Sequence, residues 1–209
     1  TVVNIYSSKL LAAFNNISVW WHVFGAAAII GILLFTTDNH QSLNWMFTAQ
    51  NNNSGFGDST YWYLVLPLGF LLTQYTITGF DASAHLSEET HDAHISAAKG
   101  IWKSIFYSAI GGYILLMSFL YVATNTDYIN SFDPEVNPYG GGSIIALLAS
   151  ALGTGMKFKL IMIITTLGQI FCVTACLTSC SRMMYAFSRD GAVPGGNLWK
   201  KVNKQGVPL

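Results

Sequence analysis

The sequence predicts an all-α protein that crosses a membrane several times. Hydrophobic residues make up 52% of the 209 residues and charged residues only 10%, whereas soluble domains usually carry roughly 25% charged residues. Several apolar segments are long enough to supply the roughly 20 helical residues that span a bilayer. The expected spans are residues 17–36, 61–90 with a break near 79–81, 100–124 and 157–188. We therefore expect a polytopic transmembrane domain that contacts the lipid bilayer.

The first span carries a histidine near its start, in the run Trp20-Trp21-His22. Because histidine titrates near neutral pH, an imidazole inside a membrane protein could carry or sense a proton. The alternative is an aromatic belt at the membrane interface, where tryptophan is common. The residues alone leave both interpretations of His22 open.

The second segment is interrupted by a glycine and an acid, Gly79 and Asp81. Glycine loosens a helix, and a carboxylate within a bilayer is costly unless it faces protein or water. One interpretation is a discontinuous helix with half-helices at 61–78 and 82–90. The other is that the span ends at Phe80 and Asp81 caps a following helix, because aspartate is a favoured N-cap.

A discontinuous helix would create a binding site at its break, as in many secondary transporters. Unpaired backbone groups at a break are tolerated only beside protein or a water-filled cavity, where they can bind a ligand. The carbonyl groups just before Gly79 would suit an ammonium group. The rings of Tyr75 and Phe80 could stack over a ligand or close its pocket. The expected substrate-binding residues are Tyr75, Thr76, Ile77, Thr78, Gly79, Phe80 and Asp81.

Two further groups are candidates for gating and for a pathway. Glu88 follows Asp81 by seven residues and shares its helical face. It is either a cytoplasmic gate that pairs with lysine or arginine, or part of a solvated helix end. On the fourth span, small residues recur every four positions from Gly168 to Cys180, which favours close helix packing. Candidates to line the pathway are Cys176, Thr178 and Ser179.

Other classes of function lack their motifs. Three cysteines without a CxxC spacing predict neither a disulfide framework nor a metal site. The set His85, His91 and His94 lacks further ligands, so we expect no metal and no cofactor. Hydrolase and nucleotide-binding motifs are absent, which argues against an enzyme. The basic residues form no cluster on a soluble domain, so no nucleic acid is expected as a partner.

Lysine and arginine predict the topology, because they favour cytoplasmic loops. Alternating spans put most of them on one side of the membrane: Lys9, Lys99, Lys103, Arg182, Arg189, Lys200, Lys201 and Lys204. Only Lys157 and Lys159 fall on the other side. Both termini are therefore expected in the cytoplasm. No signal peptide is visible, the chain begins without methionine and it closes in a polar loop, so both ends are expected to be cut from a longer protein.

Two long motifs resemble one family. Residues 79–90 and 181–194, together with 16–22, are similar to the amino acid permeases of the amino acid, polyamine and organocation superfamily, in the bacterial branch near the 4-aminobutyrate and choline permeases. The resemblance covers essentially the whole chain. It implies twelve helices around an inverted repeat of five plus five, in which these spans are helices five to eight.

The resemblance also implies roles for residues. In the family, helix six is unwound at its glycine, which implies the broken helix at Gly79. Its aromatic gate falls on Tyr75 and its acidic residue on Asp81. His22 matches the position where some relatives carry a lysine in place of a coupling cation. Helix one, which completes the substrate site in the family, is missing, so the chain is expected to need the remaining helices of its parent.

The implied function is secondary active transport of an amino acid or related amine by alternating access, at the bacterial plasma membrane. Coupling to protons is favoured over sodium because Asp81 and His22 are titratable, although the hydroxyls of Thr174, Thr178 and Ser179 could bind sodium. Two other classes stay open. One is a non-transporting amino acid sensor with a permease fold, and the other is a membrane-embedded enzyme that uses the histidines.

Overall fold

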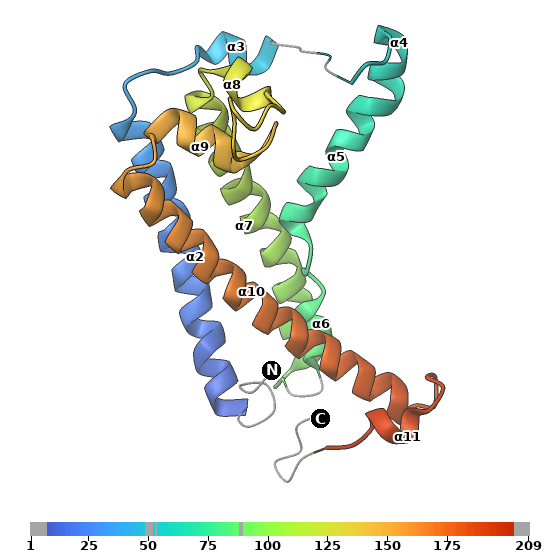
Figure 1. Cartoon of the computed structure of the whole chain (residues 1–209). Coiled ribbons are helices and arrows are strands. Elements are labelled where there is room, and N and C mark those ends of the chain that lie inside the picture. The colour runs from blue at the N-terminus through green and yellow to red at the C-terminus, as the bar shows by residue number, and fades with distance from the viewer. Residues whose placement is uncertain (1–7, 49–51, 53, 88–89, 203–209) are drawn as a thin grey trace. The chain divides into compact units, whose positions relative to one another are not determined.

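The computed structural model describes residues 8–48, 52, 54–87 and 90–202, which form helices joined by turns (Figure 1). No β-strand occurs in these ranges, so the predicted all-α class is confirmed. The short helices between and after the long ones are α3 (Leu43–Thr48), α8 (Thr126–Asn130), α9 (Ile144–Leu152) and α11 (Gly196–Trp199).

Three helices of the described part are long and apolar enough to cross a membrane. They are α2 (Ser8–Thr36), α7 (Ala93–Val122) and α10 (Met156–Arg189), with mean hydropathies of 2.0, 1.8 and 2.2 over their most apolar windows. None contains a proline, so backbone hydrogen bonding continues along each helix without interruption. Many of their large apolar side chains are exposed, as expected for helices that lipid or further helices cover in a membrane.

The second expected span is a succession of helical pieces rather than one α-helix. It begins as α4 (Asp58–Thr60), widens into a π-helix, η1 (Tyr61–Val65), and continues as α5 (Leu66–Gln74). Pro67 accounts for the widening, because its nitrogen cannot donate to the carbonyl four residues earlier and its ring clashes with that group. A π turn relieves this clash while the chain stays helical.

The helix is interrupted after a short 3-10 turn, η2 (Tyr75–Ile77). Gly79 has a φ of 87°, a left-handed conformation that glycine adopts without steric penalty. The chain re-enters an α-helix as α6 (Ala82–His85). This helix is shorter than the expected half-helix at 82–90, since Leu86 leaves the helical conformation with φ −100° and ψ 8°.

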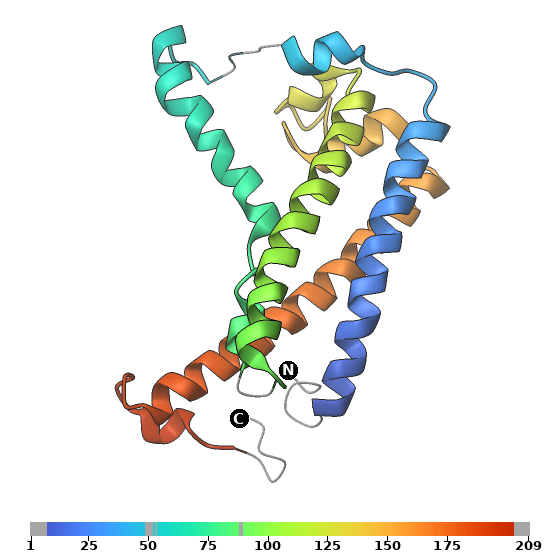
Figure 2. The same ribbon diagram turned by 180° about the vertical axis from the view of Figure 1, so that it is seen from behind.

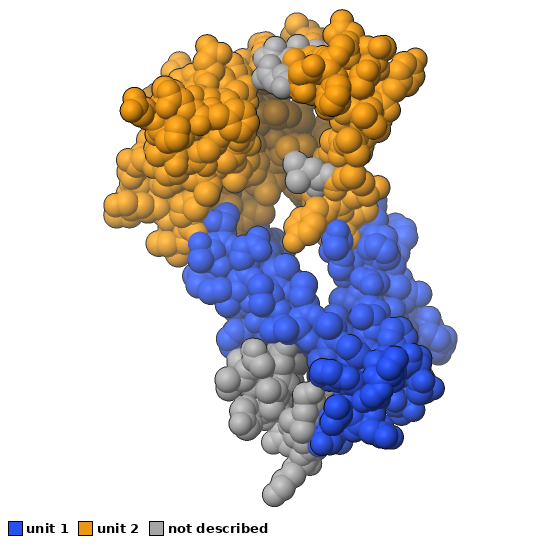
Figure 3. Space-filling model, turned by 45° about the vertical axis from the view of Figure 1, so that its right-hand side comes forward, with its two compact units in different colours: residues 1–24, 78–107, 165–209 blue, residues 25–77, 108–164 orange. Residues whose placement is uncertain are grey.

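The chain divides into two compact units (Figure 3). Unit 1 contains Thr1–Phe24, Thr78–Tyr107 and Thr165–Leu209, and unit 2 contains Gly25–Ile77 and Ser108–Ile164. One boundary therefore falls at the interruption of the second span. Unit 1 holds the start of α2, the start of α7 and the end of α10, which are the ends that an alternating topology puts on one side of the membrane.

Unit 2 contains a hydrophobic core. The α8–α9 connection lies near the C-terminal end of α7 in both ribbon views (Figures 1 and 2). Lys157, at the start of α10, donates from Nζ to the carbonyl of Thr36 at the end of α2, at 3.2 Å. A cation there complements the negative end of the helix dipole. This contact gives a local role to Lys157, one of the two lysines that fall outside the expected cytoplasmic side. The core residues are Ile29, Leu33, Val122, Ala123, Ile129, Leu147, Leu148 and Ile161.

Unit 1 packs partly around the aromatic ring of Phe171 on α10. The rings of Phe14 and Trp21 on α2 lie 5.7 and 6.3 Å from it, measured between centroids. On α6, the Ser83 hydroxyl donates to the carbonyl of Ala97 on α7 at 3.3 Å. These contacts fix the two elements that carry His22 and Asp81.

Candidate functional site

The first half-helix ends against α7 within unit 2. The Cγ2 methyl group of Thr76 packs so closely on Gly112 that a Cβ atom added there would overlap it. Beside this contact is a mostly apolar groove of about 350 Å³. It is lined by Thr73, Thr76, Ile77, Ala109, Gly112, Tyr113 and Leu116. Two of the expected substrate-binding residues, Thr76 and Ile77, therefore share one groove.

The two aromatic side chains expected at the break are open to their surroundings. Tyr75 belongs to unit 2 and is 70% exposed, whereas Phe80 belongs to unit 1 and is 42% exposed. Thr78 and Gly79 are also exposed and form the turn between η2 and α6. The rings are thus accessible to a ligand or to further helices.

Asp81 stands at the N-cap position of α6 but does not cap it. Within the described residues, its side chain makes no capping hydrogen bond; instead, its Oδ2 lies 3.0 Å from Nε2 of His85, one turn further on. A carboxylate can only accept when ionised, so Nε2 of His85 carries the hydrogen in this bond. Both side chains are partly exposed, at 55% for Asp81 and 27% for His85. Sequence reasoning missed this pair, although its i, i+4 spacing pointed to it.

His22 contacts α10 within unit 1. Its Nδ1 lies 2.7 Å from the carbonyl oxygen of Ser18, and because a carbonyl cannot donate, Nδ1 carries a hydrogen. The other nitrogen, Nε2, lies next to Gly168, where an added Cβ atom would come within 3.4 Å of it. The ring also meets the edge of Phe171 at 6.5 Å between centroids. His22 therefore has one nitrogen fixed as a donor, while the other lies beside Gly168 of α10.

The three pathway candidates on α10 do not share one face. Cys176 and Thr178 are two residues apart, or roughly 200° around a helix. Thr178 is buried and donates its hydroxyl to the Thr174 carbonyl at 2.9 Å, whereas Cys176 is exposed. Ser179 lies closer to the side of Cys176 and is half-buried.

Two sequence predictions concern gating and metals. Glu88 lies outside the described residues. Among those that are described, no group of three or more His, Cys, Asp or Glu side chains could hold a metal ion.

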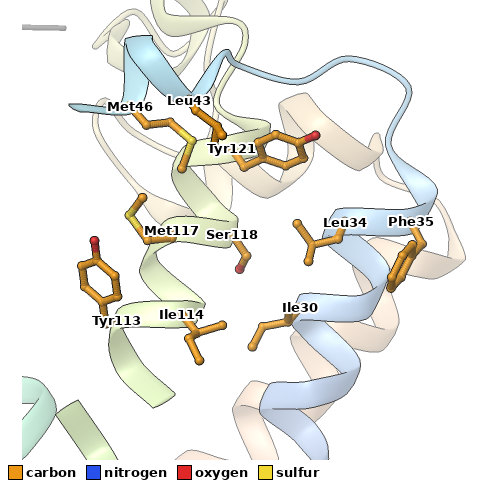
Figure 4. Close-up of a pocket in the computed structure, with 10 residues that line it drawn as sticks. All are labelled: Ile30, Leu34, Phe35, Leu43, Met46, Tyr113, Ile114, Met117, Ser118 and Tyr121. Atoms are coloured by element: carbon orange, nitrogen blue, oxygen red, sulfur yellow. The ribbon is translucent and has the colours of Figure 1, made fainter. Parts of the chain in front are cut away.

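A larger pocket in unit 2 differs in chemistry from the break. It has a volume of about 620 Å³ and lies between α2, α3 and α7 (Figure 4). Ser118 turns its hydroxyl to the Leu115 carbonyl of its own helix at 2.6 Å. The lining residues are Ile30, Leu34, Phe35, Leu43, Met46, Tyr113, Ile114, Met117, Ser118 and Tyr121. With no charged side chain in this described lining, the pocket is unsuited to a charged amino acid or amine.

Comparison with known proteins gives a consistent result. The family model described as amino acid permease matches residues 1–209. The amino-acid permease BAT1 of Arabidopsis thaliana is 33% identical over 212 residues, which cover 100% of this chain and 40% of the relative. The polyamine transporter TPO5 of Saccharomyces cerevisiae is 26% identical over 96% of this chain and 31% of its own. The thiamine transporter thi9 of Schizosaccharomyces pombe is 34% identical over 68% of this chain and 23% of its own.

The extent of these matches is also informative. The chain spans about 40% of the length of the first curated relatives that it matches. No solved structure matches it. Together with the three apolar helices, the family match identifies an integral, multi-pass membrane protein of a permease family rather than an enzyme.

Proposed function

Because the chain belongs to the amino acid permease family, we propose that it is part of a secondary active transporter for amino acids or related amines. The observation that carries this proposal is the interrupted helix. Gly79 breaks it with a φ of 87°, and Asp81 follows with a carboxylate that does not cap α6 within the described residues. Discontinuous helices of this kind provide substrate sites in secondary transporters.

The substrate class follows from the chemistry of the break. Carbonyl groups at the end of η2 would accept hydrogen bonds from an ammonium group, and Asp81 would balance its charge. The exposed rings of Tyr75 and Phe80 would contact the substrate or close the site over it. The names of the relatives, which mention amino acids, polyamines and thiamine, support a nitrogen-containing substrate.

Transport would proceed by alternating access, with the half-helices rearranging around the break. We favour protons as the coupling ion, because Asp81 places a partly exposed carboxylate at the break and the imidazole of His22 lies against α10. Sodium is the alternative, with hydroxyl oxygens of Thr178 and Ser179 as ligands. Glu88 is proposed as the acid of a cytoplasmic gate.

We also propose that both termini of the chain face the cytoplasm. The distribution of lysine and arginine supports this orientation. The two motifs that resemble bacterial permeases favour the bacterial plasma membrane as the location, while the named relatives come from plants and fungi. The remaining helices of a longer parent chain would complete the substrate site.

The proposal is tested by uptake into proteoliposomes that contain the complete protein. Labelled alanine, glutamate, 4-aminobutyrate and spermidine would serve as probes, each with an inward proton gradient, an inward sodium gradient or no gradient. Accumulation above equilibrium in one gradient identifies both a substrate and the coupling ion. Saturable binding of a probe without net flux under any condition would instead identify an amino acid sensor with a permease fold.

A further inference from the structure

We propose that His85 is a positioning residue that holds the Asp81 carboxylate at the break. The inference rests on the proposed transport function, in which Asp81 meets the substrate or the coupling proton. His85 would act through Asp81, without touching the substrate.

The first argument is the direction of the hydrogen bond. His85 Nε2 lies 3.0 Å from Asp81 Oδ2, and the hydrogen resides on the imidazole. One hydrogen bond leaves an ionised carboxylate with further acceptor sites, since its two oxygens offer about four lone pairs. Asp81 can therefore be held by His85 and still accept a hydrogen bond from an ammonium group.

The second argument is the bond that Asp81 does not make. An aspartate at an N-cap ordinarily accepts from the backbone N–H groups of the first helical turn. In the described part of the chain Asp81 makes no such bond, although its own carbonyl accepts from the N–H groups of Ala84 and His85, at 2.9 and 3.3 Å. The backbone of Asp81 is helical, with φ −79° and ψ −7°, whereas a capping residue is typically extended, so the carboxylate is left to the imidazole, which holds it in this structure.

The third argument is the position of the pair on α6. Ser83 faces α7, because its hydroxyl donates to Ala97 and an added Cβ atom on Gly100 would lie 3.0 Å from its side chain. Asp81 and His85 are four residues apart and so share one side of α6, roughly opposite to Ser83. The contact with α7 therefore anchors one face of α6 and leaves the pair on the other.

The consequence for a variant without the imidazole is specific. In His85→Ala, the Asp81 carboxylate loses the hydrogen bond from the imidazole and can take other rotamers. Folding stability should change little, because both side chains are partly exposed, while the carboxylate is no longer held at the break. If His85 had a purely structural role, His85→Ala would instead lower the folding stability, and uptake would fall in proportion to the loss of folded protein.

The test compares variants of the complete protein in proteoliposomes, using whichever of the four labelled probes shows the greatest uptake. His85→Ala should lose about tenfold in uptake, the effect of one hydrogen bond to a charged group. The loss should appear in the same parameter, KM or Vmax, that Asp81→Asn changes. His85→Gln, whose amide nitrogen can replace Nε2 as a donor, should stay within about twofold of wild type. His94→Ala, at an exposed histidine on α7, serves as the matched control.

The double variant Asp81→Asn/His85→Ala should be no worse than Asp81→Asn alone, because both changes remove the same positioned carboxylate. Three results would each overturn the proposal. They are uptake by His85→Ala equal to that of His94→Ala, a double variant whose loss is the product of the two single losses, and uptake by His85→Gln no better than by His85→Ala. Wild type without uptake of any probe would count against the transport function instead.

A second measurement does not depend on transport. The melting temperature of purified His85→Ala should stay within about 3 °C of that of His94→Ala, because a partly exposed pair contributes at most about 1 kcal/mol of folding free energy. A larger fall, with uptake lost in proportion, would make His85 a structural residue and overturn the proposal.

Discussion

Replacing Gly112 by alanine tests the contact that seats the first half-helix on α7. The added Cβ atom would overlap the Cγ2 methyl group of Thr76, which is β-branched and has few alternative rotamers in helical backbone. Overpacking of this kind costs about 1–3 kcal/mol of folding free energy. A glycine-to-alanine change within a helix also contributes about 0.5–1 kcal/mol in the opposite direction.

The adjacent glycine separates these two effects. An alanine at Gly111 would meet nothing within 4 Å among the described residues, so it gains helix propensity without a clash. Because the propensity gain is common to both variants, Gly112→Ala should be less stable than Gly111→Ala by about 1–3 kcal/mol. The Thr76→Ser change removes the Cγ2 methyl group, and it should restore most of the difference when it is combined with Gly112→Ala.

The assay is thermal unfolding of the complete, detergent-solubilised protein, with the three variants and wild type measured side by side. The order expected is Gly111→Ala at or above wild type, then Gly112→Ala/Thr76→Ser, then Gly112→Ala. Equal melting temperatures for the two alanine variants, or no rescue by serine, would refute the close packing of Thr76 on Gly112.

Three further changes probe other contacts. Asn137 is buried and its amide donates to the carbonyls of Ser131 and Gly140 at 3.2 and 3.0 Å. Asn137→Ala should therefore lower the free energy of unfolding, measured by thermal unfolding, by about 2–3 kcal/mol. A change below about 0.5 kcal/mol would contradict this prediction. Lys157→Ala should lower the free energy of unfolding by roughly 0.3–1 kcal/mol, because the hydrogen bond to the carbonyl at the end of α2 is lost. Lys159→Ala is the control and should leave this free energy unchanged; an equal loss in both variants would argue against a cap of α2 by Lys157. Gly168→Leu should displace the His22 ring and lower the uptake driven by a proton gradient, whereas unchanged uptake would separate His22 from coupling.

Much of the fold could be predicted from simple features of the sequence. Long apolar runs predicted helices, and three of them have the length and hydropathy needed to cross a membrane. Gly79 and Asp81 alone left open whether the second span is broken or ends at Phe80, and the resemblance to the permeases favoured the break. The π turn at Tyr61–Val65 was not predicted, although Pro67 was its signal.

The candidate site was harder to predict, because it depends on which surfaces meet. The Asp81–His85 pair could have been predicted from its i, i+4 spacing, but His85 was considered mainly as a candidate metal ligand. By contrast, the contact between Thr76 and Gly112 joins residues that are far apart in the chain. The same holds for His22 beside Gly168. Composition and periodicity show that a glycine is present on a helix, but not which side chain fills the space above it.

The most direct test of the account follows Asp81→Asn in proteoliposomes that contain the complete protein and an imposed inward proton gradient. Wild type should accumulate one of the labelled probes above equilibrium, and the variant should lose that accumulation while folding normally. This result would link the carboxylate at the break to coupled transport. Accumulation by Asp81→Asn at the wild-type level would contradict this proposal, because coupled transport would then proceed without the carboxylate that follows the break.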